Sequence, residues 1–315
     1  MKIMEGTAWW STLQRAAANF SSPYRVFIAS PLCLCLLLAA CSLIPHGAVD
    51  SGLAVFIPPD TQVLAGIRFD RLSATPLYRK LAAQSPAFHE FREQSGFDPA
   101  RELQEVLLAS DGKNILAIAR GAFPVKLPST MNSSLYKGYT LSGDELVAVT
   151  FLDKGRALAG PAPVVRAAID QYQSGRRGAP RGLMARADAL PRDAQIWAVM
   201  QGWSGVNPET LRQMGNAANL DRVLRAVESA SLTADLRSGV HAAFTGDCRT
   251  AQDAKTLSES LQGLLGLVRA SVPAKRPDML RAFAGIQVTQ DARAVKVNID
   301  IPQDLADKLV DELAH

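Results

Sequence analysis

The residues best suited to chemistry stand at the end of an apolar run, in the stretch Leu38-Ala39-Ala40-Cys41. The Cys41 thiol could accept a diacylglycerol, and the small alanines before it would let a membrane peptidase approach the backbone. Residues 26–40 are almost all apolar, and Arg25 precedes them, which is the order of an export signal. This run of about 15 residues is shorter than the roughly 20 that span a bilayer as a helix. Pro31 also disfavours a spanning helix.

The stretch Leu38-Ala39-Ala40-Cys41-Ser42 resembles, residue for residue, the lipobox of bacterial lipoproteins. The resemblance implies that residues 1–40 are a signal peptide that is removed, and that Cys41 becomes an N-terminus carrying lipid, including palmitate. It further implies a protein held at the cell envelope, facing the periplasm, with the membrane as its partner. Ser42 resembles the pattern directed to the outer membrane. The alternative is an ordinary signal peptide, or an anchor helix with an incidental cysteine.

The rest of the chain has a globular composition. Of the 315 residues 48% are hydrophobic and 20% are charged, which is typical of folded proteins. The net charge of +4 includes +2 from the signal, where Lys2, Arg15 and Arg25 outnumber Glu5, so the body is near +2. That charge, with 6% aromatic residues, gives no case for nucleic acid as a partner.

The cysteines divide between the signal and the body. Cys33 and Cys35 lie in the apolar run and would leave with it. With Cys41 acylated, Cys248 is the one remaining thiol, so no internal disulfide is possible in the mature chain. We interpret Cys248 as a buried structural residue and prefer this to a catalytic thiol.

The remaining residue types give no recognisable catalytic motif. The chain has no Gly-x-Ser-x-Gly elbow, no His-Glu-x-x-His and no Walker loop. His89 and Glu90 point about 100° apart on a predicted helix, so they do not form a metal pair. We interpret His241, in a predicted strand, as a surface or hydrogen-bonded histidine and not a base. His46 and His315 lie near the ends. We therefore predict no catalytic residue, no cofactor and no metal site, and a protein that is not an enzyme.

A pattern near residue 57 restarts near residue 190. Asp60 and Gln62 recur as Asp193 and Gln195, and both offsets are 133 (193 − 60 and 195 − 62). Thr75-Pro76 and Asn207-Pro208 each predict a capped helix start, offset by 132. These features predict a tandem duplication, against the alternative of coincidence. We interpret Asp60 and Asp193 as turn formers and prefer this to a pair of catalytic acids.

The predicted fold is α+β, a tandem duplication of two units that are each an antiparallel sheet with helices packed on one face. Each half reads as a strand, a helix, two strands, a crossover, two strands and a helix, and we expect each to form its own sheet. Within the halves we predict a hairpin turn at Asp111-Gly112, a loop at 124–134, a strand at 135–141 and a capped helix that starts at Thr250. The predicted domains are the signal peptide 1–40, a tether 41–56, repeat 57–174, a basic linker 175–189 and repeat 190–315.

Two residue groups leave alternatives open. Arg176, Arg177, Arg181 and Arg186 favour a solvated linker over a patch for an acidic partner. Trp197, Trp203 and Phe69 fall near equivalent strand ends, where they line a cleft between the repeats or belong to the core.

The body also resembles uncharacterised exported bacterial lipoproteins that share a Leu-Pro-x-Asp-Ala-Gln-Ile-Trp-Ala-Val stretch, here residues 190–199, and the Gly-Phe-Asp-Pro of residues 96–99. The resemblance implies no activity. The leading hypothesis is a lipid-anchored envelope protein with a structural or binding role. The alternatives are a periplasmic carrier or sensor of an apolar ligand in a groove between sheet and helices, and a hydrolase with an unrecognised site.

Overall fold

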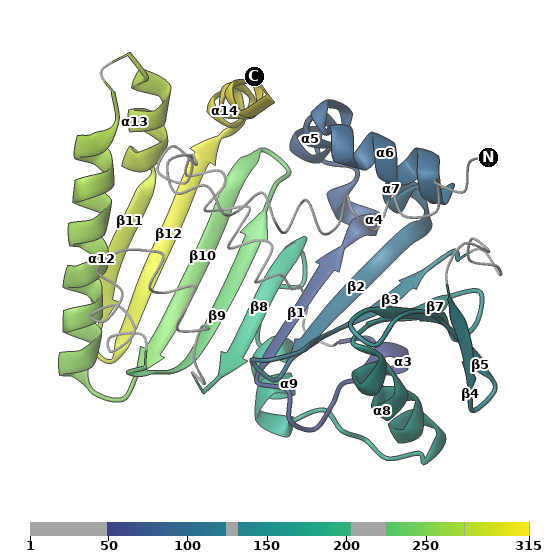
Figure 1. Cartoon of the computed structure of the whole chain (residues 1–315). Coiled ribbons are helices and arrows are strands. Elements are labelled where there is room, and N and C mark those ends of the chain that lie inside the picture. The colour runs from purple at the N-terminus through teal and green to yellow at the C-terminus, as the bar shows by residue number, and fades with distance from the viewer. Residues whose placement is uncertain (1–48, 124–131, 203–224, 274, 315) are drawn as a thin grey trace.

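One continuous antiparallel sheet runs through the molecule (Figure 1). The computed structural model describes residues 49–123, 132–202, 225–273 and 275–314. Their twelve strands have the order β11-β12-β10-β9-β8-β1-β2-β3-β7-β6-β5-β4. The strands are β1 (Val63–Arg68), β2 (Leu103–Ser110), β3 (Ile115–Gly121), β4 (Ser133–Tyr136), β5 (Tyr139–Gly143), β6 (Ala148–Phe151), β7 (Arg156–Gly160), β8 (Ile196–Gln201), β9 (Val227–Asp235), β10 (Gly239–Cys248), β11 (Ile286–Asp291) and β12 (Ala294–Pro302).

Helices connect these strands and pack on the sheet, so the predicted α+β class is confirmed. The described helices are α3 (Ser51–Ala54), α4 (Phe69–Leu72), α5 (Pro76–Gln84), α6 (Pro86–Ser95), α7 (Pro99–Glu102), α8 (Ala162–Gln173), α9 (Arg181–Asp188), α12 (Ala251–Ser271), α13 (Pro277–Ala284) and α14 (Gln303–Ala314). No helix in the described part of the chain is both long and apolar enough to cross a membrane.

The expectation of a separate sheet for each half is wrong. β1 and β8 pair antiparallel at the middle of the sheet, with Ala65 opposite Ala198, so their main-chain hydrogen bonds join the two halves. Both strands are short apolar runs that are buried on both faces, which suits a central position. Gly66 makes room for the side chain of Leu107, because a Cβ at Gly66 would lie 2.8 Å from Leu107 Cδ2.

The two halves use the same strand order outward from the centre. In the first half the order is β1-β2-β3-β7-β6, continued by β5 and β4, and in the second it is β8-β9-β10-β12-β11. No strand of one half is inserted among those of the other. The offset between the paired centres Ala65 and Ala198 is 198 − 65 = 133, the value found for Asp60 and Asp193. The shared strand order favours homology of the two halves, which remains a prediction.

The hairpins and caps follow the local sequence. The β2–β3 turn contains Asp111, whose carboxylate accepts hydrogen bonds from the backbone N–H groups of Lys113 and Asn114. Gly112 has a φ of 89°, which suits glycine. Thr75 caps α5 and Thr250 caps α12, each by accepting a backbone N–H, as predicted from sequence.

The side of the sheet that carries Leu64, here the Leu64 face, differs between the halves. In the first half this face holds fully buried side chains, and α3 and α8 pack over it. These buried residues are Leu64, Leu107, Leu116, Ile118 and Leu158. In the second half β8 still places the buried Trp197 and Val199 on this face, but the register puts polar or small residues there on β9, β10 and β12. These are Ser231, Thr233, Asp235, His241, Ala243, Thr245, Lys296, Asn298 and Asp300.

The opposite side, here the Ala65 face, is apolar in both halves. In the second half it is covered by α12, whose Ala254 and Leu257 pack with Val227, Ala230 and Val295. The principal helical cover of the two halves therefore lies on opposite faces of one sheet.

The predicted tether and linker are both shorter than expected. Val49, Leu53 and Phe56 are buried in the core, and Asp50 caps α3, so the body begins by residue 49. Residues 41–48 lie outside the described part. In the predicted linker 175–189, Arg181–Asp188 is helix α9, which packs on β8 through the buried Leu183 and Ala187. Their spacing of four residues is the apolar stripe of a short helix.

Other differences are local. The predicted strand 135–141 is two strands, β4 and β5, because Lys137 and Gly138 both have positive φ and form a tight turn. Helix α13 was not predicted. The predicted cap at Asn207-Pro208, Trp203 and most of the predicted loop 124–134 lie outside the described residues.

Candidate functional site

Two hollows occupy equivalent places in the two halves. The first has a volume of about 450 Å³ and the second about 330 Å³. Pro58, Asp60 and Thr61 line the first, and Pro191, Asp193 and Ala194, each 133 positions later, line the second. The strand residues also correspond. Ala109 pairs with Leu64, and Thr233 pairs with Trp197, which is Leu64 plus 133. By the same register Asp111 and Asn114 correspond to Asp235 and His241, which line the second hollow.

The first hollow is a groove between α8 and the sheet, with a lining that is predominantly apolar. Pro58, Pro59 and Ala109 form one side, and Pro163, Val164, Ala167 and Ala168 of α8 form the other. Helix α8 is held there by Gln171, whose Nε2 donates to the carbonyls of Val55 (2.7 Å) and Ile57 (2.9 Å).

A carboxylate stands beside this groove. Burial opposes ionisation of Asp111, but hydrogen bonds from the backbone N–H groups of Asn114 and Lys113 dominate and hold its pKa below the usual range. The groove is thus a mainly apolar space with two carboxylates, those of Asp60 and Asp111, in its lining.

The second hollow has no described helix over it. Helix α14 follows β12 as α8 follows β7, but it packs against α5, α13 and the strands β10 and β12, and none of its described residues lines the hollow. Lys80 of α5 and Asp311 of α14 form an ion pair at 2.7 Å that ties it there. The polar side chains of Asp193, Thr233, Asp235 and His241 consequently line an open hollow.

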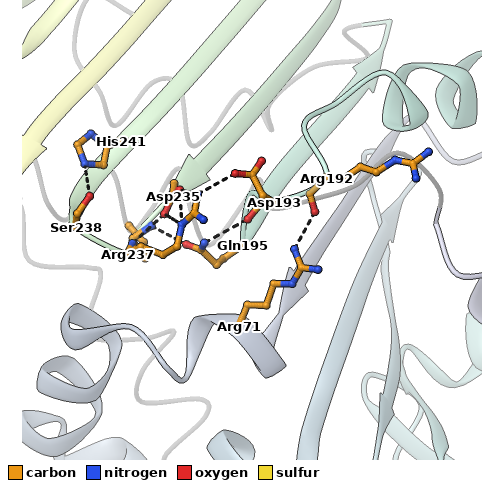
Figure 2. A network of polar contacts seen from close by, with 9 residues as sticks. Arg71, Arg192, Asp193, Gln195, Asp235, Arg237, Ser238 and His241 are labelled. Atoms are coloured by element: carbon orange, nitrogen blue, oxygen red, sulfur yellow. Dashed lines mark hydrogen bonds and ion pairs between the residues drawn. The ribbon is translucent and has the colours of Figure 1, made fainter.

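A polar network fixes the turn between β9 and β10 beside this hollow (Figure 2). Arg237 donates to Asp235 and, at 2.8 Å, to Asp193. These hydrogen bonds raise the pKa of Arg237. Burial opposes ionisation of Asp235, but the hydrogen bonds of Arg237 prevail and lower its pKa. The buried Gln195 accepts the backbone N–H of Leu236 at 2.6 Å.

The same region is tied to the first half. Arg71 of α4 donates from Nη1 to the carbonyl oxygen of Arg192 at 2.9 Å. The Arg237 network therefore holds the β9–β10 turn from within the second half, and Arg71 of the first half holds the residues just before β8.

Three side chains beside the second hollow lie within contact distance of one another in a row. The Oγ of Ser238 lies 3.1 Å from Nε2 of His241, and Nδ1 of His241 lies 2.8 Å from Oδ1 of Asp300. His241 on β10 pairs across the sheet with Asp300 on β12, and Ser238 lies in the turn that begins β10. A hydroxyl, an imidazole and a carboxylate in this order can activate the hydroxyl as a nucleophile.

Sequence reasoning missed this arrangement. It identified His241 as hydrogen-bonded, and both ring nitrogens do have partners, but it did not bring Ser238 and Asp300 to them. Asp300 is 59 positions away (300 − 241), and its contact depends on the pairing of β10 with β12. The one local signal was that Ser238, in the turn, precedes His241 by three residues.

The other candidate residues are dispersed. Asp60 and Asp193 both lie in turns, as predicted, but each belongs to its own hollow. Trp197 is fully buried and belongs to the core, and Phe69 packs edge-on against Tyr78 at 6.3 Å. Cys248 is fully buried, and burial raises the pKa of its thiol, which disfavours reactivity.

The remaining histidines and the lipidation site do not join either hollow. The ring of His89 lies 3.1 Å from the carbonyl of Ala83 and 3.3 Å from Arg92. Cys41, His46 and His315 lie outside the described residues. Among the described residues no group of three or more histidine, cysteine, aspartate or glutamate side chains could hold a metal ion.

A charged row that sequence reasoning also missed crosses the Leu64 face of the first half. Glu105 is buried, its Oε2 accepts from Arg120 at 2.9 Å, and Arg68 lies 4.0 Å from Oε1. Burial raises the pKa of Glu105, against the opposing effect of the two arginines. Arg120 also pairs with Asp50 at 2.7 Å, so the row ties the start of α3 to the sheet.

Comparison with known proteins gives the fold. No family model matches the chain, and no curated protein matches it. The solved structures that are similar to this chain include crystal forms I and III of TP0453. Form I has 10% identity and a TM-score of 0.50, and the match covers 85% of this chain and 97% of that one. Form III has 8% identity and a TM-score of 0.52, and it covers 85% and 99%. At these identities the likeness concerns the fold alone.

Proposed function

We propose that this chain is a lipid-anchored protein of the bacterial cell envelope, facing the periplasm from the outer membrane, with a binding role. The observation that carries the anchor is the stretch Leu38-Ala39-Ala40-Cys41 after an apolar run. The folded body supports a short attachment. Val49 is already packed in the core, eight positions after Cys41 (49 − 41), and eight extended residues reach about 28 Å.

This length restricts how the body can lie on the membrane. A tether that ended at residue 56 would be about twice as long and would leave the body free to turn. The shorter one holds the α3 side of the body close to the lipid surface, because α3 begins two residues after Val49.

The binding role that the geometry supports best is a small apolar ligand in the first hollow. The groove between α8 and the sheet has about 450 Å³, within the roughly 300–1,000 Å³ of small-molecule sites. Most of its lining is proline, alanine and valine, so an apolar ligand would displace water from these walls favourably. Asp111 beside the groove disfavours an anionic group and favours a neutral or cationic one.

The anchor is tested by labelling. Cells that express the chain and are fed labelled palmitate are expected to label the wild type and Cys248→Ala but not Cys41→Ala. Cys248→Ala is the matched control because it removes the buried thiol of the body. Equal label in wild type and Cys41→Ala would contradict the lipid anchor.

The ligand groove is tested with a neutral fluorescent probe, N-phenyl-1-naphthylamine, on the full chain in detergent. The wild type is expected to enhance its emission saturably, and Ala167→Phe, which fills the groove from α8, to weaken binding about tenfold or more. Ala83→Phe, at an exposed alanine of α5 outside the groove, is the control. If Ala167→Phe and Ala83→Phe bind the probe equally well, the groove is not the binding site.

A further inference from the structure

We infer that Ser238, His241 and Asp300 form a hydrolytic site for carboxylic esters beside the second hollow. This activity is separate from the ligand groove of the first half and does not depend on the lipid anchor. Ser238 would be the nucleophile, His241 the general base and Asp300 the positioning residue.

The geometry has the connectivity that the reaction needs. The serine hydroxyl meets Nε2, and the carboxylate meets the other ring nitrogen, Nδ1. The Asp300 carboxylate lies 2.8 Å from Nδ1 and so favours the tautomer with its proton on Nδ1, in which Nε2 can accept the proton of Ser238. The carboxylate also stabilises the imidazolium that forms when Nε2 takes the hydroxyl proton.

The scaffold holds these groups in register. His241 and Asp300 are cross-strand partners in the longest strand pair of the second half, so their separation is set by the sheet. Ser238 lies in a turn whose preceding residue, Arg237, is bonded to Asp235 and Asp193. That network fixes the turn from the side of the second hollow (Figure 2).

The site is open to substrate. His241 and Asp300 are 42% and 75% exposed in their side chains, and His241 lines the second hollow of about 330 Å³. No described helix covers this hollow, whereas α8 closes its counterpart. The acyl part of an ester can therefore lie in the hollow while its carbonyl carbon faces the hydroxyl.

The reaction balances with water as the one co-reactant. Ser238 Oγ bonds to the carbonyl carbon while its proton passes to His241 Nε2. The ester C–O bond breaks, and the leaving alcohol takes that proton. Water then attacks the acyl-serine, His241 accepts and returns a proton, and a carboxylic acid and free Ser238 result.

The test uses the full chain, purified in detergent, with a biotinylated fluorophosphonate and with 4-nitrophenyl acetate. The phosphonate is expected to form an adduct on Ser238, found by mass spectrometry of the wild type. Ester turnover is expected to fall about 100-fold or more in Ser238→Ala and His241→Ala. Ser271→Ala, an exposed serine on α12, is the matched control and should keep the wild-type rate.

The role of Asp300 is read from the split between kcat and KM. Asp300→Asn should lower kcat about tenfold or more and leave KM within about twofold, because a positioning residue acts on His241 and not on the substrate. Asp300→Glu keeps a carboxylate on β12 and should restore part of kcat. Asp235, which pairs with His241 from β9, remains in place in both variants.

Two results would overturn the inference. One is a wild type with no adduct on Ser238 and the same ester turnover as Ser238→Ala. The other is an adduct on Ser238 that forms equally fast in His241→Ala, which would show a merely accessible hydroxyl. The wild-type adduct needs no variant, so misfolding of a variant leaves the first result decisive.

Discussion

The two halves share a strand order, but the same face of the sheet is a core in one and a surface in the other. Equivalent positions in the register show the difference. Leu107, Ile118 and Leu158 of the first half correspond to Ser231, Thr245 and Lys296 of the second. Where the leucines lie, α8 packs and closes a groove, and where the polar residues lie, the hollow stays open. Which face of the sheet the helices cover therefore depends on the side chains of the strands and not on the strand order, which the two halves share.

The largest expected effect is at Leu107. Leu107→Ser places a hydroxyl in a fully buried site and should lower the free energy of unfolding by about 4 kcal/mol. Ser231→Leu, the same exchange in reverse at the equivalent position, should change it by about 0.5 kcal/mol or less, because Ser231 is not part of a packed core. Urea unfolding followed by circular dichroism measures both. Similar losses in the two variants would refute the contrast between core and surface.

A smaller contrast is expected at Glu105 and its counterpart Ser229. Glu105→Ala leaves Arg68 and Arg120 without their shared carboxylate and should cost about 3 kcal/mol. Ser229→Ala removes one hydrogen bond, donated to Asp247 at 2.8 Å, and should cost about 1 kcal/mol. Thermal unfolding of the two variants gives the ranking, and a larger loss in Ser229→Ala would reverse it.

The smallest effect is a shared acid sensitivity of Asp111 and Asp235. Both carboxylates have lowered pKa values, so each stabilises the fold above the ordinary value of 3.8. That contribution is lost as the pH falls through and below 3.8. Asp111→Asn and Asp235→Asn should each flatten the fall of the free energy of unfolding in that range. A slope identical to wild type in either variant would show that its carboxylate is not involved.

Much of the local structure follows from the sequence. The Asp111-Gly112 turn, the Thr75-Pro76 helix start and the Thr250 cap depend on neighbouring residues, and each lies where it was predicted. The repeated offset of 133 also predicted that Ala65 and Ala198 occupy equivalent positions in the two halves. It did not predict that their two strands would pair.

What the sequence did not reveal depends on contacts between distant segments. The pairing of β1 with β8 joins two apolar strands that are 133 positions apart. The sequence of each strand was also compatible with a position at the edge of a sheet. The same holds for His241 with Asp300, and for Arg120 with Asp50. Helix α9 was hidden for a different reason, since its arginines resemble those of a linker and only Leu183 and Ala187 indicate the packed side.

The seam between β1 and β8 has a consequence for how the molecule loses its structure. In a chain of two separate domains each part can melt alone, and a cut between them releases both. Here the backbone amides of each half hydrogen-bond to the other, for example Arg68 to Gln195 and Gln201 to Gln62. Opening either half would expose the central strand of its neighbour as a bare edge. The two halves should therefore denature as one cooperative unit, with a single heat-absorption peak.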